Sequence, residues 1–144
     1  MATKPKPGIV VATLVLLILI AAYHLVMGTF SLFGAVVGDP EQAAELLGEE
    51  PPPEWSIYLG ALSMLVVGAA AVVLAVLVGK SSPSARTAVI GVNTVAAAAL
   101  LVMMVTTPAF ALDAIISAVF LLVTAGLMFS SGAKQHFAAS PAGY

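Results

Sequence analysis

Four long stretches of the chain are apolar enough to form membrane-spanning helices. The first starts at Gly8 and meets no charged residue before Asp39, and the other three cover residues 56–79, 85–106 and 109–130. A hydrocarbon core of about 30 Å requires about 20 apolar helical residues. None of these stretches contains Pro, which would remove a helical hydrogen bond. The pattern predicts an all-α integral membrane protein, a four-helix antiparallel bundle with short loops and a single domain over residues 1–144.

The first stretch is longer than one span requires. Residues 8–37 make 30 positions, which is about 45 Å of helix. We expect residues 8–28 to lie in the membrane. The remainder either extends the helix outward to residue 37 or follows a break near Gly28, Gly34 or Gly38.

The few charged residues predict the orientation. All the basic residues lie before the first stretch, between the second and third, or after the fourth: Lys4, Lys6, Lys80, Arg86 and Lys134. In a four-span chain these three places lie on one side, and the positive-inside rule makes that side cytoplasmic. Six of the seven acidic residues lie in segment 39–54, on the opposite side. We therefore predict a multi-pass protein of the plasma (inner) membrane with both termini cytoplasmic.

A cleaved signal peptide is the alternative for the N-terminus, because Lys4 and Lys6 precede an apolar run. A cut after Ala22 would place Ile20 where a small residue is preferred, and would put Lys134 and Lys80 on opposite sides. An uncleaved first span is favoured.

The acidic segment 39–54 is the longest connection between spans. Asp39 as N-cap, Pro40 at the first helical position and Gln42 predict a short helix to about Leu47, ended by Gly48. The segment is either a solvated loop, which we favour, or a surface for a basic partner or a weak cation site. Trp55 and Tyr58 begin the second span and are expected to anchor it at the interface. Residues 131–144, with Lys134 and His136, are expected to form a frayed tail.

Composition narrows the function classes. The 144 residues are 61% hydrophobic and 8% charged, whereas soluble domains are about 45–50% apolar and about 25% charged. A net charge of −2 argues against nucleic acid as a partner. The chain has no Cys, and its two His lie 112 positions apart. This set of residues does not favour a metal site. Haem ligation by His24 would need a second axial ligand from elsewhere. No enzyme motif is visible, so we expect neither catalysis nor a cofactor.

Polar residues inside the spans are the candidates for function, because such residues usually face the bundle interior. Asp113 and His24 are expected at about the same depth, near the outer surface, and could form a proton-titratable pair. Tyr58 and Ser117 could support this pair. The alternative is a structural hydrogen bond, which we favour. Asn93, near the middle of the third span, is expected to bond a neighbouring helix rather than a substrate.

These features favour a non-enzymatic accessory or assembly subunit of a larger membrane complex. Small residues one turn apart, such as Ala71 with Ala75 and Ala114 with Ala118, favour close helix contacts. Its expected partners are the lipid bilayer and other membrane subunits, or a second copy of itself. The alternative is a small homo-oligomeric transporter or channel that uses His24 and Asp113, although a transporter is expected to place an ionisable group near the midplane. A cofactor-binding redox subunit is a third class. The composition is common among small bacterial membrane proteins.

Overall fold

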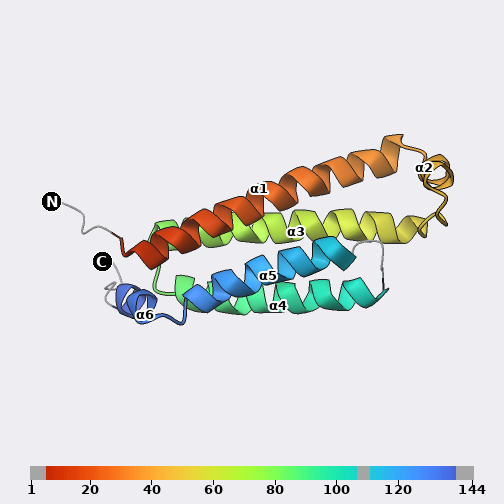
Figure 1. Ribbon diagram of the computed structural model, residues 1–144. Coiled ribbons are helices and arrows are strands. Elements are labelled where there is room, and N and C mark those ends of the chain that lie inside the picture. Colours follow the sequence, from red (N-terminus) through yellow and green to blue (C-terminus); the bar gives the residue numbers. More distant parts are fainter. Residues whose placement is uncertain (1–5, 107–110, 139–144) are drawn as a thin grey trace.

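The structure, a computed structural model, describes residues 6–106 and 111–138. In these ranges the chain forms helices and no strands (Figure 1). In chain order the helices are α1 (Gly8–Val37), α2 (Pro40–Leu47), α3 (Glu54–Gly79), α4 (Ala85–Thr106), α5 (Ala111–Leu127) and α6 (Ser131–Ala138).

Helix α1 resolves the question of the long first stretch. It is a single uninterrupted helix of 30 residues, so it continues past Gly28 and Gly34. It ends at Gly38, whose N–H donates to the Gly34 carbonyl at 2.8 Å. At about 1.5 Å per residue it is about 45 Å long, which exceeds one hydrocarbon core.

The short helix α2 forms as its caps predict. The Asp39 carboxylate accepts hydrogen bonds from the backbone N–H groups of Glu41 and Gln42, both at 3.1 Å. At the other end Gly48 has a φ of 69°, a left-handed conformation that favours glycine.

The helices form two antiparallel pairs. Helix α1 lies along α3, and α4 lies along α5 (Figure 1). The beginning of α1 and helix α6 lie at one end of the bundle, which we call the terminal end. Helix α2 lies at the opposite end, which we call the α2 end.

Three of the described helices, α1, α3 and α4, are long and apolar enough to cross a membrane. Helix α5 has 17 residues and meets the same criterion only together with α6, to which it is joined by a 63° bend. Large apolar side chains point outward along these helices, including Leu19, Phe30 and Val66, which are 55%, 69% and 67% exposed. Together these features are those of a helical membrane protein.

The prediction of a frayed tail is wrong for residues 131–138, which form α6. The Ser130 hydroxyl caps this helix by accepting from the Ala133 N–H at 3.2 Å. Ala133 and Phe137 lie on one face of α6 and are buried. Burial of Phe137 supplies the tertiary contact that a short helix needs. Residues 139–144 lie outside the described residues.

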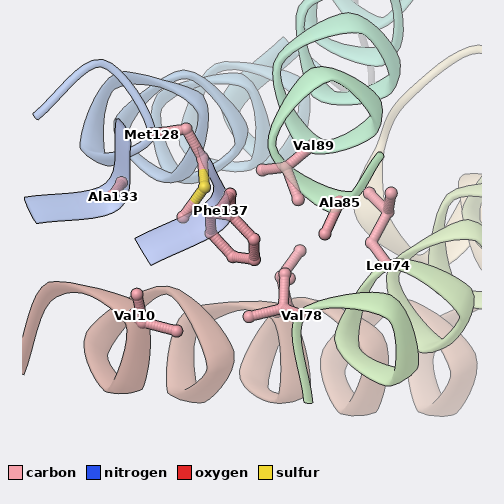
Figure 2. Close-up of a cluster of buried hydrophobic side chains, with 9 residues drawn as sticks. Val10, Leu74, Val78, Ala85, Val89, Met128, Ala133 and Phe137 are labelled. Atoms are coloured by element: carbon pink, nitrogen blue, oxygen red, sulfur yellow. The ribbon is translucent and has the colours of Figure 1, made fainter. Parts of the chain in front are cut away.

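The core consists of two clusters of buried side chains. The terminal cluster gathers residues of α1, α3, α4 and α6, together with Met128 just after α5, around the Phe137 ring (Figure 2). It comprises Val10, Leu17, Leu74, Val78, Ala85, Val89, Met128, Ala133 and Phe137. The alanine cluster lies nearer the α2 end and comprises Ile20, Ala21, Ala71, Ala97, Leu100, Ala114, Ala118 and Leu121.

Candidate functional site

A pocket of about 350 Å³ lies between α1 and α5. Its buried floor contains Ile20, His24 and Ser117. Its rim is apolar or aromatic and at least two-fifths exposed; it contains Leu19, Tyr23, Ile116 and Phe120. The pocket therefore opens on the outer surface of the bundle, with its polar groups at the bottom.

His24 occupies the floor with one ring nitrogen bonded and the other free. The side chain is 2% exposed, and its Nδ1 lies 2.8 Å from the Ile20 carbonyl oxygen. A carbonyl oxygen only accepts, so Nδ1 carries the hydrogen of this bond. In the neutral ring Nε2 is then a bare acceptor. Among the described residues Nε2 has no hydrogen-bond partner.

Ser117 is the second polar residue of the floor. It is also 2% exposed, and its hydroxyl has no partner within the part of the chain that the structure describes. Other hydroxyls in these helices bond the carbonyl one turn earlier, as Thr124 Oγ1 does to Phe120 at 2.7 Å. The Ser117 hydroxyl makes no such bond with the described residues, and its oxygen is fully buried.

The predicted direct pair of His24 and Asp113 does not form, because Nε2 is unpartnered and Nδ1 bonds Ile20. Instead the Tyr23 hydroxyl donates to the Asp113 carboxylate. Adjacent helical residues point about 100° apart, so only one of Tyr23 and His24 can face that carboxylate. Tyr23 was not among the predicted residues, although its place beside His24 and its phenolic hydroxyl donor were a usable signal.

The other predicted residues lie elsewhere. Tyr58 donates to the Ala35 carbonyl at 3.4 Å, eleven residues beyond His24 along α1, or about 16 Å. It therefore does not support His24. Asn93, on α4, is 1% exposed, and its Nδ2 has no partner within residues 6–106 and 111–138. Trp55 is 60% exposed at the start of α3, a position suited to an interfacial anchor.

The acidic segment lines a separate cavity of about 520 Å³ at the α2 end. Asp39, Glu41 and Glu54 contribute to its wall, but the Asp39 carboxylate is engaged in capping α2. No three acidic, His or Cys side chains of the described ranges come together as a metal-binding group.

A third feature is an apolar groove of about 550 Å³ between α3 and α4, which we call the α3–α4 groove. Half of its twelve lining residues are small: Ser63, Ala70, Ala88, Gly91, Ala96 and Ala99. A Cβ atom added at Gly91 would meet no atom within 4 Å, so this part of the groove is open.

No family model, curated protein or solved structure matches the chain.

Proposed function

We propose that this protein is a non-enzymatic integral membrane protein that acts as an accessory or assembly subunit of a larger membrane complex. The observation that carries the proposal is the α3–α4 groove, an apolar, small-residue surface that the side chains of the described residues do not fill. The groove is proposed to receive a transmembrane helix of another subunit.

In this proposal the chain crosses the plasma membrane four times, with α5 and α6 together forming the fourth, bent segment. Helix α5 is about 26 Å long, so the bend into α6 would lie close to one membrane surface. The described basic residues gather at the terminal end: Lys6, Lys80, Arg86 and Lys134. The acidic residues of segment 39–54 lie at the α2 end. This charge asymmetry supports a cytoplasmic terminal end.

The contact between α1 and α3 illustrates what a small residue does in these helices. A Cβ added at Gly28 would lie 3.1 Å from the Leu65 backbone nitrogen, and one added at Gly68 would lie 3.0 Å from the Leu25 nitrogen. The two backbones therefore approach as closely as glycine permits. The α3–α4 groove has small residues of the same kind, but no helix of the described ranges lies against them, which supports an external helix as its occupant.

The test is extraction of the native protein in a mild detergent, followed by sizing and identification of the chains that copurify. We expect a stable complex with a different membrane protein. A Gly91→Leu substitution fills the groove and should release that partner. Gly126→Leu is the matched control, because a Cβ at Gly126 also meets nothing within 4 Å but lies on α5, away from the groove.

A pure homo-oligomer in this experiment would contradict the proposal and favour the transporter or channel alternative. The geometry gives that alternative less support. His24 bonds Ile20 and Asp113 bonds Tyr23, so the two titratable groups are not directly connected.

A further inference from the structure

The α1–α5 pocket combines two polar atoms that need partners. His24 Nε2 and Ser117 Oγ belong to side chains that are each 2% exposed, and neither has a hydrogen-bond partner among the described residues. Buried polar groups in folded proteins are almost always hydrogen-bonded, because an unsatisfied group loses its hydration without compensation. Both residues line the same pocket, and both atoms are covered in the ligand-free chain, so a single bound group that satisfies them must displace neighbouring side chains at the floor.

The hydrogen bond from His24 Nδ1 to Ile20 selects the chemistry of that group. It leaves Nε2 as an acceptor, which requires a donor from the ligand. The Ser117 hydroxyl can donate or accept. A ketone or ester carbonyl only accepts, so it would leave Nε2 unsatisfied. A hydroxyl group can donate to Nε2 and accept from Ser117 at the same time.

The size and lining of the pocket indicate what the rest of the ligand is like. The volume of about 350 Å³ is far larger than the roughly 30 Å³ share of one water molecule. It lies within the range of about 300–1,000 Å³ found for small-molecule sites. The exposed rim residues Leu19, Ile116 and Phe120 are apolar, so a ligand can enter sideways from the membrane interior and leave an apolar tail outside.

We propose that the α1–α5 pocket binds a membrane-soluble alcohol or phenol, whose hydroxyl group donates to Nε2 of His24 and accepts from the Ser117 hydroxyl. The apolar body of the ligand packs against Leu19, Ile116 and Phe120. This site is independent of the α3–α4 groove.

The test uses two probes that share one apolar body, para-octylphenol and its methyl ether para-octylanisole. Only the phenol can donate a hydrogen bond. Calorimetric titration of the purified full chain in detergent should show about tenfold tighter binding of the phenol, the factor that one well-buried hydrogen bond supplies. Equal affinities for the two probes would overturn the proposal.

Two variants locate the binding site. Ser117→Ala should weaken the binding of both probes about threefold to tenfold, because either ligand oxygen can accept from the Ser117 hydroxyl, and His24→Leu should abolish the preference for the phenol. Ser63→Ala is the matched control, since Ser63 lies on α3 and lines the α3–α4 groove instead; it should keep the full preference. A preference for the phenol that survives His24→Leu, or unchanged affinities in Ser117→Ala, would place the phenol elsewhere and contradict the proposal.

Nitrogen NMR of isotope-labelled histidine provides a second readout that does not depend on the folding of a variant. In the wild-type chain, the Nε2 resonance of His24 should move towards the hydrogen-bonded value when the phenol is added, and should stay unchanged with the anisole. An unchanged Nε2 resonance at saturating phenol would show that His24 does not bind the hydroxyl.

Discussion

The two halves of the bundle are held together in different ways. At the terminal end, large side chains such as Leu74, Met128 and Phe137 fill the core (Figure 2). Polar groups also link segments there, because Lys6 donates to the Gly79 carbonyl and Arg86 Nε donates to the Met128 carbonyl at 2.9 Å. Towards the α2 end, five of the eight residues of the alanine cluster are Ala.

The difference extends to polar groups. The described buried side-chain atoms without a partner belong to His24, Asn93 and Ser117, none of which is in the terminal cluster. Large interlocking side chains close one half of the molecule. Small residues bring backbones together in the other half but leave space beside them, and the α1–α5 pocket lies in that space. The α1–α5 pocket therefore lies away from the large side chains of the terminal cluster.

The largest effect is expected in the terminal cluster. Phe137→Ala should lower the free energy of unfolding by about 3 kcal/mol, because it empties the centre of the cluster and undocks α6. Thermal unfolding in detergent measures this loss. Phe129→Ala is the control, since Phe129 is 57% exposed and should change stability by less than about 0.5 kcal/mol. Similar losses in the two variants would mean that the Phe137 contacts do not stabilise the terminal end.

The second-largest effect is expected at the close contact of α1 with α3. In Gly68→Ala the new Cβ would lie 2.8 Å from Leu25 Cγ and 3.0 Å from the Leu25 backbone nitrogen. The two helices must separate, and we therefore expect the free energy of unfolding to fall by about 2 kcal/mol. Thermal unfolding in detergent measures this loss.

Gly126→Ala is the control for this prediction, because its Cβ meets nothing within 4 Å. It should be neutral or stabilise the helix by up to about 1 kcal/mol. If both glycines tolerated alanine equally, the α1–α3 contact would not depend on glycine.

The smallest effect is expected at Ser117, and it has the opposite sign. Ser117→Ala removes a buried hydroxyl that has no described partner, so the free energy of unfolding of the ligand-free protein should rise by about 0.5 kcal/mol. The same substitution should weaken phenol binding.

Thr124→Val is the matched comparison for Ser117→Ala. Thr124 is fully buried and its hydroxyl bonds the Phe120 carbonyl at 2.7 Å. We expect the Thr124→Val substitution to lower the free energy of unfolding by about 1 kcal/mol. A comparable loss in Ser117→Ala would indicate that the Ser117 hydroxyl is already satisfied without a ligand.

Local features of the sequence predicted most of the helical structure. Pro placement and unbroken apolar runs located the long helices, and Asp39, Pro40 and Gly48 located both ends of α2. They failed for α6, because eight residues with one large apolar side chain do not form a stable helix alone. That helix depends on the place of Phe137 among Met128 and residues of three other helices, α1, α3 and α4.

The site was predicted in part. The sequence placed His24 and Asp113 at one depth because depth follows from counting residues along a helix. It named Ser117 but not Tyr23. Burial of His24 and contact of Tyr23 with Asp113 depend on how α1 is rotated about its own axis, which residue counting does not supply.

Hydrophobicity, proline placement and helix caps act between residues that are near in the chain, so the sequence determined the places of the long helices, both ends of α2 and most of the candidate polar residues. Only the tertiary structure decided which of two adjacent side chains faces α5. That choice depends on close contacts such as Gly28 with Leu65 and Gly68 with Leu25, which join residues about 40 positions apart. Such contacts set the rotation of α1, and the rotation leaves the Nε2 atom of His24 at the floor of a pocket without a partner.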